Sequence, residues 1–192
     1  MKKLLILGAG TAGTMMLNKL HRRLDLSAWQ LTIVDKERVH YYQPGFLFIP
    51  FGIYQPEEVM RAKTDFFPEG VNVIWDEVEE VLGDTSQVRL ASGDMLSYDV
   101  LIVATGTSPR PEETPGLKGD LWYTDIFDFY THDGASRLAR KLEDWEGGRL
   151  VINLAETIIK CPVAPLEFAF LADAYFTEKG MRDKVDIFYV TP

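Results

Sequence analysis

The sequence is poor in cysteine and in basic residues, and it has no long hydrophobic run. Its one cysteine cannot form a disulfide within the chain, so nothing indicates an oxidising compartment and a cytoplasmic location is expected. The 20 basic residues against 29 acidic ones give a formal net charge of -9, which argues against a nucleic-acid partner because phosphate binding requires clustered Lys and Arg. No stretch approaches the roughly 20 apolar residues that span a bilayer, although peripheral association with the inner face of a membrane and a homo-oligomer both stay open.

The N-terminal residues predict a strand, a helix and a second strand. An apolar run over 3–7 is followed by a glycine turn, and a second strand over 30–34 ends at Asp35. Parallel pairing of the two strands requires a right-handed crossover, so the chain begins as an α/β fold. Four apolar residues are expected on one side of the helix: Met15, Met16, Leu20 and Leu24.

The glycine turn matches the GxGxxG pattern of dinucleotide-binding proteins. Gly8 permits the tight turn, Gly10 lets backbone N–H groups reach a pyrophosphate, and Gly13 lets helix and strand pack closely. The helix N-terminus adds a partial positive charge, and Asp35 is placed to accept hydrogen bonds from a ribose diol. A glycine turn kept only for packing is the alternative. The cofactor-binding residues expected here are Gly8, Gly10, Thr11, Ala12, Gly13, Asp35 and Lys36.

The middle of the chain favours FAD over NAD as the dinucleotide. Three short β-rich runs over 71–96, separated by turn signals, predict an antiparallel meander inserted between parallel strands. The apolar run 100–104 then predicts a central parallel strand. It ends in Ala104, Thr105 and Gly106, whose small side chains let a second stretch of backbone approach the same ligand.

A proline-rich linker over 109–116 marks a domain boundary. Beyond it the pattern predicts a helix over 133–145 and a second strand-helix-strand unit over 149–154, 165–179 and 185–190. The sequence thus predicts an α/β protein of two Rossmann-like (FAD/NAD(P)-binding) units, with a parallel sheet and an inserted antiparallel β meander. The domains expected are 1–110, an amino-terminal FAD-binding part, and 120–192, a second nucleotide-fold-like part.

The second unit has no glycine between its first strand and its helix. Side chains at every position there should keep a pyrophosphate from the backbone, and Glu156 would repel it, which argues against NAD(P)H at this place. Cys161 stands there instead. The helix N-terminus and the neighbouring Lys160 both favour the thiolate, the form that acts as a nucleophile. A cysteine buried as an inert hydrophobe is the alternative.

Four segments together resemble a known family. The stretches LLILGAGTAG and IVATGTSPRP resemble the two-dinucleotide-domain flavoproteins of the pyridine nucleotide-disulphide oxidoreductase class. KCPVAP, residues 160–165, resembles the KCxxAP element of the sulfide:quinone oxidoreductase branch, which includes the flavocytochrome c sulfide dehydrogenase flavoprotein. The aromatic loop 40–52 is similar to that branch's loop with a proline beside the flavin, which adds Gln43 and Pro44 to the expected FAD-binding residues.

The resemblance implies FAD as cofactor, Cys161 as the catalytic sulfur acceptor, a small-molecule sulfur donor and a quinone as electron acceptor. It covers essentially the whole chain, yet it implies a second cysteine and an acidic GD motif in a carboxyl half that these 192 residues do not contain. The chain therefore resembles an amino half and is expected to be incomplete at the C-terminus. An NAD(P)H-dependent disulfide or coenzyme A-disulfide reductase, and a non-catalytic nucleotide-binding half-module, are the alternatives.

The three histidines show no metal-ligand spacing. His21 and His132 are interpreted as surface groups, and His40 either faces the flavin or belongs to an aromatic loop cluster. The apolar loop 46–54 either lines a quinone path or contributes to the core. No metal site is expected.

Overall fold

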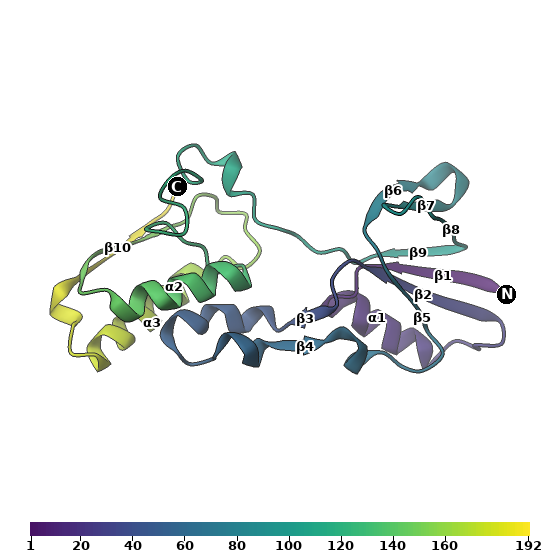
Figure 1. Ribbon diagram of the computed structural model, residues 1–192, viewed down its shortest axis with the longest axis horizontal. Coiled ribbons are helices and arrows are strands. Elements are labelled where there is room, and N and C mark those ends of the chain that lie inside the picture. The colour runs from purple at the N-terminus through teal and green to yellow at the C-terminus, as the bar shows by residue number, and fades with distance from the viewer. The chain divides into compact units, whose positions relative to one another are not determined.

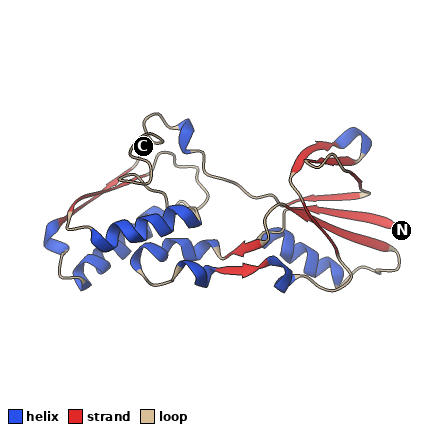
Figure 2. Ribbon diagram, in the orientation of Figure 1, coloured by secondary structure: helices blue, strands red, loops and turns tan.

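The computed structural model describes residues 1–192, and the chain divides into two compact units. The first consists of Met1–Tyr41 and Met60–Gly106, and the second of Tyr42–Val59 and Thr107–Pro192. Each unit contains both helices and strands (Figures 1 and 2). The segment Tyr42–Val59, expected in the first domain, belongs by its contacts to the second unit.

A parallel sheet in the order β5-β2-β1-β9 forms the centre of the first unit. Its central strand β1 aligns Ile6 with Ile33 of β2 and Ile102 of β9. Apolar residues cover both faces, as a parallel sheet requires. Helix α1 (Thr11–His21) packs on one face through Leu17. The strands are β1 (Lys2–Leu7), β2 (Trp29–Asp35), β5 (Asn72–Trp75) and β9 (Val100–Val103).

The antiparallel meander covers the other face of this sheet. It consists of β6 (Val78–Leu82), β7 (Gln87–Leu90) and β8 (Met95–Ser97), with a 3-10 turn, η5 (Gly83–Thr85), between its first two strands. Val88 and Leu90 of β7 are fully buried against Leu5 and Leu7 of β1. The fold class predicted from the sequence is confirmed in this unit.

One strand was assigned to the wrong sheet. The run over residues 71–75 was expected in the meander, but β5 pairs in parallel with β2 at the edge of the central sheet. Val73 packs with the cluster beneath α1 and Ile74 with the cluster beneath the meander. Apolar contacts on both faces are the mark of a parallel strand, and a four-residue run does not reveal them in the sequence.

The buried face of α1 also differs from the prediction. Met15 and Met16 are exposed, Leu17 is fully buried, and Leu24 lies beyond the end of the helix. The cause is Gly13, which lies against the glycine turn. Residues three or four apart share a helix face, so Gly13 brings Leu17 to the sheet and turns the two methionines outward.

A short antiparallel pair adds to the first unit. Strand β3 (Val39–Tyr41) pairs with β4 (Met60–Ala62), and a 3-10 turn, η4 (Lys63–Phe66), follows. The Lys63 N–H donates to the carbonyl of Arg38 at 2.9 Å, which extends the pairing by one step. This pair fixes the backbone of Lys63 close to the end of β2.

The second unit is built around the parallel pair β10 (Gly148–Asn153) and β11 (Val185–Val190). Helix α2 (His132–Asp144) begins where the Thr131 side chain accepts a hydrogen bond from the Gly134 N–H, and α3 (Ala164–Glu178) connects the two strands. The helices predicted over 133–145 and 165–179 are confirmed to within a residue or two. Short 3-10 turns complete the unit: η1 (Gln43–Leu47), η2 (Ile49–Phe51), η3 (Pro56–Val59), η6 (Pro111–Glu113) and η7 (Arg182–Lys184).

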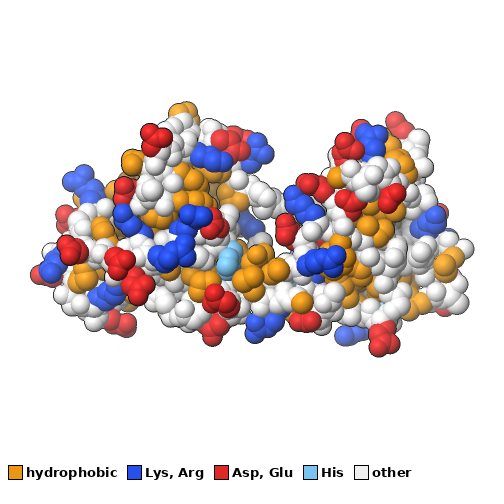
Figure 3. Space-filling model, in the orientation of Figure 1, with side chains coloured by type: hydrophobic (Ala, Val, Ile, Leu, Met, Phe, Trp, Pro, Cys, Tyr) orange, Lys and Arg blue, Asp and Glu red, His pale blue; other side chains and the backbone are white.

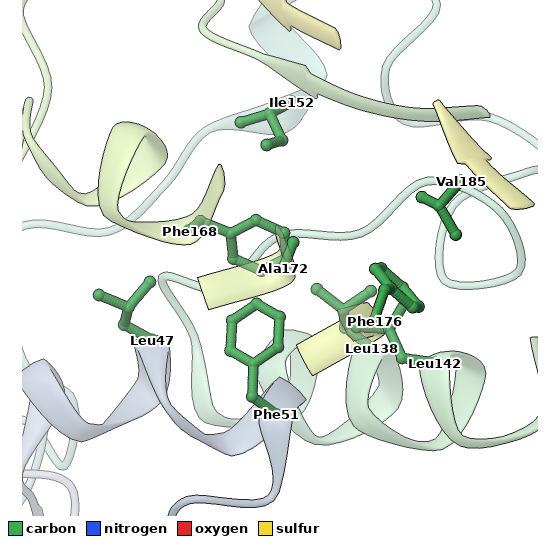
Figure 4. Packing of buried hydrophobic residues seen from close by; sticks show 9 residues of the cluster. All are labelled: Leu47, Phe51, Leu138, Leu142, Ile152, Phe168, Ala172, Phe176 and Val185. Atoms are coloured by element: carbon green, nitrogen blue, oxygen red, sulfur yellow. The ribbon is translucent and has the colours of Figure 1, made fainter. Parts of the chain in front are cut away.

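The core of the second unit explains why residues 42–59 belong to it. Leu47 and Phe51 are buried against α2 and α3 (Figure 4), and the rings of Phe51 and Phe168 lie 4.8 Å apart. Burying one such phenylalanine contributes about 2 kcal/mol. The nine residues of this cluster are Leu47, Phe51, Leu138, Leu142, Ile152, Phe168, Ala172, Phe176 and Val185.

Candidate dinucleotide site and cysteine turn

Two of the three motif glycines are required by packing. Gly8 has a φ of +91°, which L side chains rarely adopt, and a Cβ there would overlap the carbonyl of Ala104. A Cβ on Gly13 would overlap the carbonyl of Gly8. The turn between β1 and α1 is thus pressed against the end of β9. A dinucleotide is not needed to explain these two glycines.

Gly10 differs, because a Cβ built on it meets no atom within 4 Å. Gly10 is the N-cap of α1 and supplies no side-chain cap, the first turn contains no acidic residue, and Thr11 and Ala12 are exposed. Open space before an uncapped helix N-terminus suits an anion, since the first amides of a helix lack backbone partners. The chain therefore fits a pyrophosphate at the position where the sequence predicted one.

The end of β9 forms the second side of this site. The Ala104 N–H donates to the Leu7 carbonyl at 2.7 Å, and the Thr105 Cα would lie 2.9 Å from a Cβ on Gly8. Thr105 and Gly106 are exposed, and Gly106 has a φ of +72° with no neighbour near its Cβ position. The two backbone segments predicted to approach one ligand lie next to each other.

Asp35 is more heavily bonded than the sequence suggested. Its Oδ2 accepts from the Ala9 N–H at 2.6 Å and from Lys63 Nζ at 2.7 Å, and its Oδ1 accepts from the Glu37 N–H at 2.8 Å. The ion pair is almost enclosed, with side-chain exposures of 6% for Lys63 and 13% for Asp35. Sequence reasoning missed Lys63, since nothing in its neighbourhood indicates a contact 28 positions away. Lys36, also expected at the cofactor, pairs with Glu77 at 2.8 Å in an exposed position.

The histidines also have defined places. His40 lies on β3 with its ring 5.0 Å from that of Phe66, and its buried Nδ1 has no hydrogen-bond partner. Burial, and secondly the charge of Lys63, lower the pKa of His40. His21 and His132, interpreted as surface groups, keep part of their surface exposed. Both are half-buried, with Nε2 at 2.9 Å and 3.0 Å from backbone carbonyls in distant segments.

The aromatic loop is mostly core. Gln43 and Pro44 lie exposed in η1 of the second unit, but Phe46, Leu47, Ile49 and Phe51 are buried within that unit. Ile53 and Tyr54 at the end of the loop remain exposed. Packing therefore accounts for residues 46–51, and no cofactor or quinone contact is required to explain their apolar character.

Cys161 is exposed, so the alternative of a buried inert thiol was wrong. It precedes Val163, the N-cap of α3, by two residues, and α3 begins at Ala164 rather than Pro165. The Cys161 carbonyl accepts from the Tyr130 hydroxyl at 2.8 Å and from the Ala164 N–H at 3.3 Å. Burial, the largest cause, raises the pKa of Tyr130 to about 12, so this phenol is a donor throughout the neutral range.

A parallel sheet with a glycine turn at the mouth of a helix, and an acidic side chain ending the neighbouring strand, defines a dinucleotide-binding α/β protein. Residues 2–152 match the model of the pyridine nucleotide-disulphide oxidoreductase family, and the chain belongs to that family. FAD is the cofactor of this family of flavin-dependent oxidoreductases.

The chain is similar to quinone oxidoreductases of two kinds within this family. The chain is 30% identical over 189 residues to the mitochondrial sulfide:quinone oxidoreductase of Mus musculus. The matched region covers 98% of this chain and 42% of the mouse protein. The chain is also 29% identical over 144 residues to a type II NADH:quinone oxidoreductase of Staphylococcus haemolyticus. This matched region covers 74% of this chain and 34% of the relative. The solved sulfide:quinone oxidoreductase of Aquifex aeolicus superposes with a TM-score of 0.81 at 20% identity, over 98% of this chain and 43% of that one.

These relatives confirm the resemblance predicted from the glycine turn and the KCPVAP element. The chain spans about two fifths of the length of the curated relatives it matches first. None of its helices combines the length and the apolar character needed to cross a membrane.

Proposed function

We propose that this chain is the FAD-binding and thiol-bearing part of an enzyme that oxidises sulfide or a related sulfur compound and passes the electrons to a quinone. The observation that carries the proposal is the exposed Cys161 at the start of α3. It lies in a strand-to-helix connection without glycine, within a family whose curated relatives include sulfide:quinone oxidoreductases.

The first unit supplies the FAD-binding residues in this proposal. The uncapped start of α1, open at Gly10, receives the pyrophosphate, with Thr11 and Ala12 donating backbone N–H groups. Asp35 accepts from the ribose, and the backbone of 104–106 borders the same ligand. Bound FAD accepts two electrons at a time and returns them to a second substrate.

Cys161 of the second unit is the sulfur acceptor. Cys161 Sγ would take up the sulfur of HS⁻ as a persulfide. Forming this S–S bond is a two-electron oxidation that releases one proton to solvent, and bound FAD would supply the oxidising capacity. An exposed thiol suits a small soluble donor, because no side chain must move aside for the donor to reach it. The fixed Cys161 carbonyl limits the positions that the thiol can take.

The second candidate donor is a nicotinamide nucleotide, since the Staphylococcus relative is named an NADH:quinone oxidoreductase. The structure of the β10–α3 connection disfavours it in this chain. Glu156 is exposed there, and no glycine opens the backbone to a pyrophosphate.

The test is Cys161→Ser in the protein that carries this sequence, with Thr157→Ser as a matched control in the same exposed connection. We expect Cys161→Ser to retain bound FAD and to lose at least about 100-fold in sulfide-dependent quinone reduction, the scale of removing a nucleophile. The control should stay within about twofold of the unaltered protein. Unchanged sulfide oxidation by Cys161→Ser would refute the role of the thiol.

A further inference from the structure

We propose that Lys63 is a positioning residue of the FAD site, acting through Asp35. Lys63 is the only buried lysine or arginine of the chain. Its Nζ lies 2.7 Å from Asp35 Oδ2, and both side chains are nearly enclosed. The inference rests on the proposed binding of FAD at the glycine turn.

The number of hydrogen bonds that the Asp35 carboxylate can accept determines how Lys63 affects ribose binding. An ionised carboxylate has about four acceptor sites, two on each oxygen. Oδ2 uses both of its sites, one for the Ala9 N–H of the glycine turn and one for Lys63 Nζ. Oδ1 uses one for the Glu37 N–H and keeps one. Asp35 can therefore accept a single ribose hydroxyl through Oδ1, and not both hydroxyls of the diol as the sequence had suggested.

The surrounding backbone fixes this arrangement. The Lys63 N–H donates to the Arg38 carbonyl directly beyond the β3–β4 pair, so the lysine stem starts from a defined point beside the end of β2. Burial, and secondly the charge of Lys63, lower the pKa of the partly buried His40, which lies near the ammonium. Removing the ammonium leaves Asp35 held by the Ala9 and Glu37 N–H groups alone, so the carboxylate is held less firmly toward the ribose side.

The experiment is a double-mutant cycle on FAD affinity in the apoprotein of the protein that carries this sequence. Lys63→Met, Asp35→Asn and the double variant are titrated with FAD, and Lys141→Met, which removes an exposed lysine paired with Asp125 at 2.6 Å, is the matched control. We expect Lys63→Met to weaken binding about tenfold and the double variant to bind within about threefold of Asp35→Asn alone. The control should change affinity less than twofold.

A second readout separates positioning from general weakening of the fold. The affinity ratio between FAD and its 2′-deoxyadenosine and 3′-deoxyadenosine analogues is measured for each protein. In the unaltered protein one of the two analogues should bind about tenfold more weakly than FAD, and in Lys63→Met this discrimination should fall below about threefold. A ratio cancels any loss common to all three ligands. If Lys63→Met does not fold, Lys63→Gln, which keeps a neutral donor, is read by the same ratio.

The outcomes separate this inference from the proposed function. If the double variant loses FAD affinity by the product of the two single losses, Lys63 does not act through Asp35. If Lys63→Met still distinguishes FAD from its deoxyadenosine analogues as well as the unaltered protein does, the positioning role is also overturned. In both cases the proposal that the chain binds FAD stands. An unaltered apoprotein that binds no FAD would overturn the proposed function itself.

Discussion

Gly10 and Gly13 of the glycine motif should respond differently to replacement by alanine: Gly10→Ala should weaken FAD binding, and Gly13→Ala should destabilise the fold. At Gly13 an added methyl overlaps the Gly8 carbonyl, which is backbone and cannot rotate away. Overpacking of this kind costs typically 1–3 kcal/mol, and here the strained atoms lie in a turn held against β9, so we expect a loss of at least about 2 kcal/mol in the free energy of unfolding.

At Gly10 the methyl meets nothing within 4 Å, and the φ of -73° suits alanine. Alanine is a poorer N-cap than glycine, but it also restricts the unfolded chain; these effects have opposite signs and are each about 0.5–1 kcal/mol. The free energy of unfolding of Gly10→Ala should therefore stay within about 1 kcal/mol of the unaltered value. Its methyl occupies the space before the helix N-terminus, so FAD affinity should fall at least about tenfold, or about 1.4 kcal/mol.

The assays are guanidinium unfolding of each apoprotein and FAD titration of each folded variant. The expected result is a binding defect without a stability defect for Gly10→Ala, and a stability defect for Gly13→Ala. If Gly10→Ala binds FAD as tightly as the unaltered protein, the open space at Gly10 does not receive the pyrophosphate. If Gly13→Ala unfolds at the unaltered denaturant concentration, the packing argument is wrong.

Three further predictions concern polar groups that are partly buried. Tyr130→Phe removes the hydroxyl that donates to the Cys161 carbonyl at 2.8 Å and should lower the free energy of unfolding by about 1 kcal/mol. The control Tyr175→Phe removes a hydroxyl 3.5 Å from its acceptor, the Leu142 carbonyl, and should lower it by less than about 0.5 kcal/mol. Equal losses for the two variants in denaturant unfolding would contradict this prediction. His40 should titrate below its ordinary pKa of 6.5 by NMR, and stability should rise with pH between that lowered pKa and 6.5 because the unfolded chain binds more protons there. Lys63→Met should raise the His40 pKa without restoring 6.5, since burial is the larger cause; an unmoved His40 pKa would mean that the Lys63 charge does not reach the ring.

The sequence predicted those parts of the fold that local pattern determines. The glycine spacing, the strand ending at Asp35 and the helix after the cysteine follow from residues close together in the chain, and the structure has them. The buried face of α1 was predicted wrongly because it was chosen from the apolar residues alone. The helix in fact turns toward the rest of the first unit the face that contains Gly13, which lies against the glycine turn, and Leu17.

Long-range contacts could not be predicted in the same way. Lys63 pairs with Asp35 only because β4 returns beside β3, and Phe51 joins Phe168 only after the chain has folded. The exposed Cys161 likewise has its carbonyl bonded to the hydroxyl of Tyr130, which comes 31 residues earlier. Residues close together in the sequence do not indicate which of these distant residues will be in contact.

The central proposal is that sulfide, acting at the Cys161 thiol, and not a nicotinamide nucleotide, reduces the flavin of the protein that carries this sequence. The most direct measurement is anaerobic mixing of the FAD-loaded protein with sulfide and, separately, with NADH, followed by the loss of oxidised-flavin absorbance. The account predicts rapid bleaching by sulfide that disappears in Cys161→Ser, and no bleaching by NADH. Rapid bleaching by NADH, with sulfide inert, would contradict it.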